Sequence, residues 1–196
     1  MKPPHAIAWA FFVAFLPLLA ARAEPAPVPD FDRSALPDTV ADYDGFRSRI
    51  FREGRVYIAG QPTEEAVRAL PDHGVTLVVN LRTPGEMEDR ERVSFDEKAV
   101  LEELGIKYVW LPQGGEEHPY GPEMVKAFIE ALEHHEGPVL LHCTVGWRAS
   151  HLWAAYLVEY YDFPVAEAYA RGAAMGIGTT PFEKFLGRDL KMTEAD

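Results

Sequence analysis

One short segment of the sequence combines a nucleophile with groups that bind an anion. Cys143 follows His142 at the end of the apolar run Val139-Leu140-Leu141, and four residues, including Gly146, separate it from Arg148. A cysteine thiolate is a good nucleophile, and the planar guanidinium of an arginine holds two oxygens of a phosphate at once. Glycine lets the loop backbone turn inward, because no Cβ stands in the way. These residue types in this order predict an oxyanion site with Cys143 as the attacking group.

The segments on either side of this loop are predicted to aim it at one point. Val139-Leu140-Leu141 is typical of a buried strand, and the apolar run from Ala149 to Tyr161 predicts a central, buried helix. Backbone N–H groups of the loop and of the helix N-terminus then converge on one spot, where the helix dipole adds positive potential. The same field favours the thiolate form of Cys143 over the thiol. One device thus serves both anion binding and activation of the nucleophile.

Alternating strand and helix signals surround the loop. Apolar, β-branched runs predict strands at residues 56–58, 75–81 and 106–111 in addition to the one before Cys143. Helices are expected to begin at capping residues: Thr63, Ser94 in a capping box with Glu97, and Pro122. This alternation predicts an α/β fold with a central, mostly parallel sheet of about four to five strands flanked by helices. Ligands of such sheets bind at the carboxyl ends of the strands, where Cys143 is expected.

The first residues have the pattern of a secretory signal. Lys2, the apolar run 6–19 and Ala21-Arg22-Ala23 predict a cleavable signal peptide over residues 1–23, and hence a periplasmic or secreted protein. The apolar run contains Pro17 and is shorter than the roughly 20 residues that span a bilayer. No stable membrane insertion is therefore expected once the signal is removed.

The rest of the chain is predicted to be one domain preceded by a leader. Residues 24–45 hold several prolines and show no apolar periodicity, so they are expected to be an extended leader to a domain over residues 46–190. Cys143 is the only cysteine of the chain. Exported proteins usually pair their cysteines, and a single one cannot pair within its chain. Cys143 is then a free thiol, an intermolecular bridge or a small buried hydrophobic residue.

Charge limits the class of partner. Loss of residues 1–23 would leave 17 of the 19 basic side chains against all 31 acidic ones, a net charge of −14. Such a surface repels nucleic acid and anionic membranes, so an anionic substrate needs a local positive site. No glycine motif for nucleotides follows a strand, and the adjacent His134 and His135 point to different helix faces. Neither a cofactor nor a metal is expected, and the oligomeric state is left open.

The loop from His142 to Arg148 resembles the signature of the cysteine-dependent protein tyrosine and dual-specificity phosphatases. Those enzymes place five residues between cysteine and arginine. The spacing of four found here is similar to a bacterial branch, the beta-lactamase-hydrolase-like phosphatases, which are often exported. The resemblance extends over roughly residues 50 to 175 and includes three further segments: Ala59 to Thr63, Val79 to Arg82 with Glu86, and Gly105 to Tyr108.

The resemblance implies the protein tyrosine phosphatase fold and hydrolysis of a phosphorylated protein, with phosphotyrosine as a candidate, or of a small phosphate ester through a phosphocysteine. Cys143 is then the nucleophile and Arg148 the phosphate clamp. The family's acid is an aspartate; here Glu116, Glu117 or His118 could donate the proton, or these residues are solvated surface groups. The substrate-binding candidates lie in the loop and just after it: His142, Thr144, Val145, Gly146, Trp147 and Ser150, the last as a hydrogen-bond donor to the cysteine.

Several alternatives stay open at this level. A rhodanese-like sulfurtransferase also uses a strand-end cysteine with a four-residue gap to a basic residue, and a non-catalytic module could bind an oxyanion or phospho-ligand in the same cradle. His142 could orient the cysteine loop or be a buried, satisfied side chain. Gln61 and Arg82 could line the site, although Arg82 could equally pair with Glu86.

Overall fold

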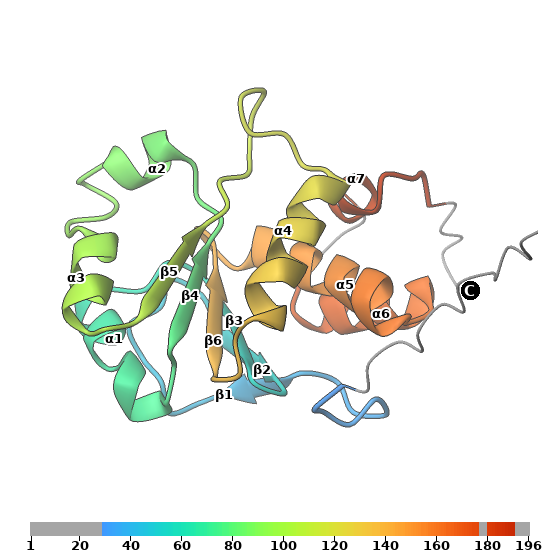
Figure 1. Cartoon of the computed structure of the whole chain (residues 1–196), viewed down its shortest axis with the longest axis horizontal. Coiled ribbons are helices and arrows are strands. Elements are labelled where there is room, and N and C mark those ends of the chain that lie inside the picture. The colour runs from blue at the N-terminus through green and yellow to red at the C-terminus, as the bar shows by residue number, and fades with distance from the viewer. Residues whose placement is uncertain (1–28, 177–179, 191–196) are drawn as a thin grey trace, which may run out of the picture.

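The computed structural model describes residues 29–176 and 180–190, which form a six-stranded sheet between two layers of helices (Figure 1). The strand order is β1-β2-β3-β6-β4-β5. Strands β3, β6, β4 and β5 run parallel, whereas β1 and β2 extend the sheet in antiparallel pairing. The strands are Asp38–Val40 (β1), Ile50–Glu53 (β2), Val56–Ala59 (β3), Leu77–Asn80 (β4), Lys107–Trp110 (β5) and Val139–His142 (β6).

Helices cover both faces of the parallel strands. One face carries α4 (Pro122–Glu133), α5 (Trp147–Tyr161), α6 (Val165–Ala174) and α7 (Phe182–Leu186). The other carries α1 (Glu64–Arg68), a 3-10 turn (Leu70–His73) and α3 (Glu97–Glu103), and the short α2 (Pro84–Glu88) follows β4. The predicted α/β architecture with a mostly parallel core is confirmed.

The alternation of side chains along each strand explains the two cores. Val139 and Leu141 of β6 pack with α4, α5 and α7, whereas Leu140 between them packs on the α1 and α3 side. Successive side chains of a strand point to opposite faces, so a strand with a helix layer on each side must be apolar throughout. All four residues of β3, β4 and β6 are buried accordingly.

Helix α5 lies at the centre of one layer, as its composition predicts. Its residues from Arg148 to Leu157 are all buried, and it packs against α4, α6 and α7. The first turn of this helix is therefore held rigidly at the end of β6 (Figure 1). This rigidity matters because that turn follows the cysteine loop directly.

The structure corrects the expected leader. Residues 38–40 form β1 and pair with β2, and the rings of Phe31 and Trp153 approach to 6.2 Å between centroids. Glu53 binds Arg171, which also donates to the carbonyl of Arg33. The packed domain thus begins well before residue 46, and β1 and β2 raise the number of strands to six. The prolines of this segment hid its apolar anchors, which are isolated and show no period.

A second correction concerns the start of α3. The N-cap is Asp96, whose side chain accepts from the backbone N–H of Ala99, so the capping box from Ser94 to Glu97 is wrong. Glu97 is instead the first residue of the helix and is 1% exposed.

The predicted signal peptide lies outside the described residues. Within 29–176 and 180–190, no helix combines the length and apolar character needed to cross a bilayer.

Candidate active site

Cys143 is the first residue after β6, and its surroundings hold the loop in a tight curve. Its backbone N–H donates to the carbonyl of Ala59 at 3.3 Å, and its side chain is buried. The loop then passes so close to β3 that a Cβ on Gly60 would lie 3.1 Å from both the Thr144 carbonyl oxygen and the Val145 Cα. Glycine is therefore required at position 60, which explains one conspicuous residue of the Gly-Gln-Pro segment.

Gly146 ends the loop and starts α5. It has φ +85°, a left-handed conformation that other residues rarely adopt, and it is the N-cap of the helix. The N–H groups of the first helical turn, from Trp147 to Ala149, have no acceptor within the helix. Together with the helix dipole, they make the space in front of this turn favourable for an anion. The predicted role of Gly146 in turning the backbone agrees with this geometry.

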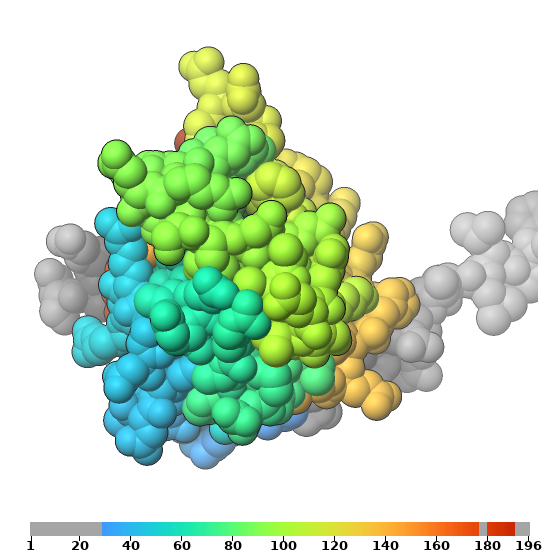
Figure 2. Space-filling view, turned by 90° about the vertical axis from the view of Figure 1, so that its left-hand side faces the viewer, coloured from blue at the N-terminus to red at the C-terminus, as the bar shows by residue number. Residues whose placement is uncertain are grey.

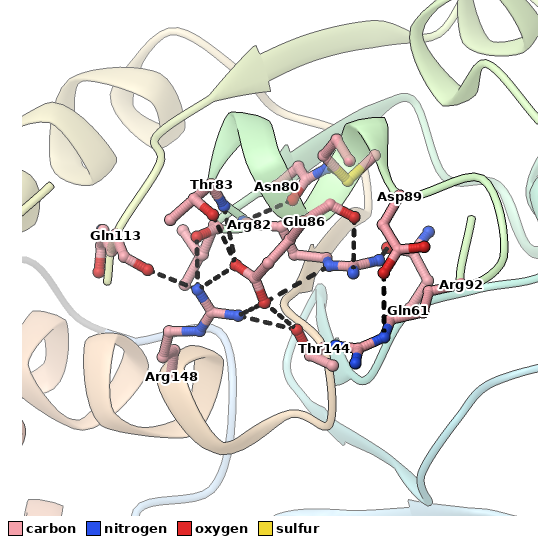
Figure 3. A network of polar contacts seen from close by, with 12 residues as sticks. Gln61, Asn80, Arg82, Thr83, Glu86, Asp89, Arg92, Gln113, Thr144 and Arg148 are labelled. Atoms are coloured by element: carbon pink, nitrogen blue, oxygen red, sulfur yellow. Dashed lines mark hydrogen bonds and ion pairs between the residues drawn. The ribbon is translucent and has the colours of Figure 1, made fainter. Parts of the chain in front are cut away.

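Arg148 is held by a carboxylate that the sequence associates with another partner. Its two terminal nitrogens donate to the two oxygens of Glu86 at 2.8 and 2.7 Å, a bidentate ion pair (Figure 3). Its Nη2 also donates to the hydroxyl of Thr144 at 2.8 Å, and that hydroxyl in turn donates to Glu86 at 2.5 Å. Glu86 therefore binds both the arginine and the cysteine loop.

Two backbone carbonyls complete the orientation of Arg148. Its Nη1 donates to Gln113 at 2.5 Å and to Leu81 at 3.3 Å. No hydrogen bond among the described residues uses its Nε, so this N–H is left for a ligand. Glycine at position 114 accommodates this packing, since a Cβ there would lie 3.3 Å from Nη1. The guanidinium thus has a fixed aim before any substrate enters.

Glu86 stays ionised in this arrangement. Burial alone would raise its pKa, but the hydrogen bonds from Arg148, from Thr144 and from the backbone of Thr83 outweigh burial and lower the pKa to about 2. Glu86 is consequently an acceptor at neutral pH and has no proton to donate to a leaving group. Its position is secured by a capping box at the start of α2, with Thr83 as the N-cap.

Gln61 and Arg82 lie beneath the loop and support it from below. The backbone N–H of Gln61 donates to the Thr144 carbonyl at 3.1 Å, and the Gln61 side chain accepts from Arg82 at 2.7 Å. Arg82 is fully buried and also donates to the backbone carbonyl of Glu86 at 2.9 Å. The side chain of Asn80 accepts from the Arg82 backbone at 2.7 Å and so turns the chain after β4. The Asn-Leu-Arg segment therefore supports the site rather than lining its mouth.

His142 has a single clear partner. Its Nε2 lies 2.8 Å from a carboxylate oxygen of Glu97, and both side chains are completely buried. The other Glu97 oxygen accepts from the Gln61 amide at 2.8 Å. His142 is thus tied to α3 across the sheet. Its imidazole is not a generic core side chain, because its contact is with a carboxylate directly behind the nucleophile.

The candidate acids are the predicted residues that the structure does not bring to Cys143. Glu116 and Glu117 are exposed at the tip of a loop that projects beyond the rest of the molecule (Figures 1 and 2). The base of this loop is closed by a bond from the N–H of Gly114 to the carbonyl of His118 at 2.6 Å. No hydrogen bond among the described residues joins the three candidate side chains to Arg148.

The other loop candidates divide between the rim and the interior. Val145 and Trp147 are 51% and 40% exposed, so they form an apolar rim beside the buried cysteine. Ser150 is buried, and its hydroxyl donates to the carbonyls of Gly146 and Trp147 at 3.0 Å each. The expected hydrogen bond from Ser150 to Cys143 is not present, because this hydroxyl is engaged within its own helix.

Three residues enter the site that motif analysis did not assign to it. Glu97 was predicted to be a helix cap, and Glu86 was considered only as a partner of Arg82. Tyr120 was not considered. Burial raises its pKa, and the charges of Arg148, Cys143 and Glu86 all act on its hydroxyl, which therefore faces the site as a protonated phenol. An aromatic residue two positions before the Pro122 helix start carried no signal that could have singled it out.

Solved structures of similar fold are phosphatases or carry that description. A putative phosphatase (DUF442) from Shewanella putrefaciens CN-32 is 26% identical, with a TM-score of 0.54 over 70% of this chain and 87% of that one. TpbA of P. aeruginosa is 20% identical, with a TM-score of 0.58 over 79% of this chain and 91% of that one. The latter likeness, at that identity, concerns the fold.

Relatives in sequence point to one family. A beta-lactamase hydrolase-like protein of Xylella fastidiosa (strain 9a5c) is 32% identical over 136 residues, which are 66% of this chain and 30% of that protein. A protein of the same description from Agrobacterium fabrum is 33% identical over 100 residues, half of this chain and 22% of that one. The matched region thus spans less than a third of these relatives. Residues 55–158 match the family model described as "Beta-lactamase hydrolase-like protein, phosphatase-like domain", and the chain belongs to this family of cysteine-dependent, protein tyrosine phosphatase-like proteins.

Proposed function

We propose that this domain hydrolyses phosphate monoesters through a phosphocysteine formed on Cys143. The observation that carries the proposal is the placement of Arg148. Its guanidinium is aimed by Glu86, Thr144 and two carbonyls at the end of β6, where the first turn of α5 also offers its N–H groups. A tetrahedral dianion fits this combination of a cation and converging donors, and the thiolate stands at its base.

The reaction proceeds in two displacements. The Cys143 sulfur attacks phosphorus, the ester P–O bond breaks, and the leaving oxygen takes a proton from an acid. Water then attacks the phosphocysteine, the S–P bond breaks, and inorganic phosphate and the thiolate are released. Arg148 and the α5 amides stabilise the equatorial oxygens in both steps.

The acid of the first step is proposed to come from the 116–118 segment. Gly114 and Gly115 both have positive φ, so the loop that carries Glu116, Glu117 and His118 is built around two residues of high conformational freedom. Replacing the true donor should slow hydrolysis of phenyl phosphate by roughly 10²-fold or more, and that of p-nitrophenyl phosphate far less, since a good leaving group needs no proton. Equal losses on both esters would exclude an acid role.

The substrate is proposed to be a phosphate monoester with an apolar or aromatic body. TpbA has been solved in complex with phosphotyrosine and PTPMT1 with PI(5)P, so this fold accommodates monoesters of very different size. Here the exposed Val145 and Trp147 beside Cys143 favour an ester whose organic part is apolar. Phosphotyrosine is the first compound to assay.

Replacement of the nucleophile tests the mechanism. Wild type should release phosphate from p-nitrophenyl phosphate and show a cysteine-bound phosphate by mass spectrometry after rapid acid quench. Cys143→Ser should lose both signals. Phosphate release that survives in Cys143→Ser would exclude the mechanism.

A binding module is the second candidate, because Glu86 already occupies the bidentate edge of Arg148 and no acid lies beside Cys143. Saturable phosphate binding by wild type without any turnover would support that function instead. Cyanide-dependent thiosulfate turnover without phosphate release would support sulfur transfer.

We further propose that the protein is exported. The support is the signal-like pattern of residues 1–23 and the single cysteine. Fusion of these residues to a reporter that is active only outside the cytoplasm tests export, and a silent reporter would contradict it.

A further inference from the structure

Glu97 is an unusual residue to find behind a nucleophile. It is the first residue of α3, its side chain is 0% exposed, and it lies 45 positions before the histidine that it contacts. A buried carboxylate is costly unless it is paired and hydrogen-bonded. Both of its oxygens are engaged, one by His142 Nε2 and the other by the Gln61 amide, each at 2.8 Å.

The charge state of Glu97 determines where the proton of His142 lies. Burial alone would raise the pKa of Glu97, but His142, Gln61 and Arg82 together lower it, so the carboxylate is ionised. An ionised carboxylate can only accept a hydrogen bond. The Nε2 atom of His142 must therefore carry a proton. The opposite nitrogen, Nδ1, is buried and has no partner among the described residues.

The groups around this pair leave the imidazole as the positive end nearest the nucleophile. Arg82 from the end of β4 and Tyr108 from β5 face Glu97, and Asp96 lies beside it on the chain. Burial and the charge of Glu97 raise the pKa of Tyr108, so this phenol stays neutral. His142 alone connects Glu97 to the cysteine, because it adjoins Cys143 in the chain.

We propose that Glu97 is a positioning residue that keeps His142 as an imidazolium directly behind Cys143 and thereby favours the thiolate. The positive end of the pair lies next to the sulfur, and the negative end lies one side chain further away. A nearby positive charge stabilises a thiolate. The role deepens the proposed function, since it acts on the nucleophile, but its measurement needs no turnover.

The single cysteine permits a direct measurement. The ultraviolet absorbance of the thiolate is recorded against pH for each variant and for the same variant carrying Cys143→Ser, and the difference reports Cys143 alone. Glu97→Gln should move the midpoint of thiolate formation upward by about one pH unit. In a His142→Asn background, Glu97→Gln should give no such upward movement, because the charge that it sustains is gone.

Glu53→Gln is the matched control. Glu53 is also buried and paired with an arginine, but it lies at the opposite end of the parallel strands, since it is in register with Val56, whose partner on β6 is Val139. Its replacement disturbs a buried carboxylate to a similar degree and should leave the midpoint unchanged. A shift of equal size in Glu53→Gln would show that loss of packing, and not charge, is being measured.

The sign of the shift decides the proposal. An unchanged midpoint in Glu97→Gln would reduce Glu97 to a structural role. A downward shift would mean that His142 is neutral and that Glu97 opposes the thiolate, which also overturns the proposal. If Glu97→Gln does not fold, ¹⁵N resonances of His142 in the wild-type protein answer the same question, because both ring nitrogens must be protonated at pH 7. Absent phosphatase activity with these results intact would overturn only the proposed function.

Discussion

The cysteine loop is held at each end by a glutamate, and the two ends differ in their surroundings. At the cysteine end, Glu97 and His142 are wholly buried and have no access to water. At the arginine end, the side chain of Glu86 is 27% exposed and that of Arg148 10%. Electrostatic interactions weaken with solvent access. The buried end therefore provides a fixed field, whereas the open end can exchange partners when a phosphate enters.

The difference suggests a division of labour. The buried pair has all its donors and acceptors directed at the protein, so it acts on the sulfur without competing for substrate. Glu86 occupies the same guanidinium that a phosphate must use, and only Nε of Arg148 is unengaged among the described residues. Substrate binding at the open end thus requires sharing of the terminal nitrogens with Glu86. The predictions below test the open end against the buried end, whose own test is the thiolate measurement.

The largest effect is expected when the open end loses its fork. Arg148→Lys keeps a positive charge but replaces two parallel donors with one ammonium, so kcat/KM for p-nitrophenyl phosphate should fall roughly 10²- to 10³-fold. Steady-state kinetics measure the loss. Arg92→Lys, at an exposed arginine that pairs with Asp89, is the matched control and should stay within about twofold of wild type. Retained activity in Arg148→Lys would show that the guanidinium geometry is unimportant.

A smaller effect is expected when only the support of the fork is altered. Glu86→Gln leaves Arg148 in place but removes one partner of the bidentate pair, so kcat/KM should fall about 10-fold through misorientation. Inorganic phosphate, assayed as a competitive inhibitor, should bind more weakly. Tighter phosphate binding in Glu86→Gln would reverse the interpretation, because Glu86 would then compete with substrate for the clamp.

The smallest effect is a pH dependence of stability confined to the open end. The folded pKa of Glu86, about 2, lies below its ordinary value of 4.5, so its stabilisation is complete above pH 4.5 and is lost as the pH falls toward 2. Discounted for partial exposure, this is on the order of 1 to 2 kcal/mol. Urea unfolding of wild type should therefore lose more free energy across that window than Glu86→Gln does.

A second buried group sets the control for this measurement. Burial lowers the pKa of His151 to about 4, so protonation destabilises the fold as the pH falls from 6.5 toward 4. That loss is common to wild type and Glu86→Gln and cancels between them. Parallel curves below pH 4.5 would contradict the role of Glu86.

Local pattern was sufficient for the frame of the site. The apolar run of β6, the uniformly apolar α5 and the glycine between them all follow from residue types, and each reflects a local rule of backbone or burial. The pairing of Cys143 with Arg148 is likewise a consequence of short-range geometry. These features were predictable because the residues that determine them are neighbours in the chain.

Tertiary structure alone decided which polar side chains meet. Ser94 and Glu97 have the spacing of a capping box, but Asp96 caps α3, and Glu97 turns inward to His142 on another element. A sequence shows that a carboxylate lies near a helix start, and its partner depends on how that helix docks on the sheet.

The same physical reason applies to the open end and to the leader. Glu86 contacts Arg148 across 62 positions, and residues before 46 join the sheet through β1. Periodicity identifies the face of an element, because burial repeats along the chain. It does not identify the pairing of charges between elements, because many pairings are compatible with one pattern until the backbone brings one pair within 3 Å.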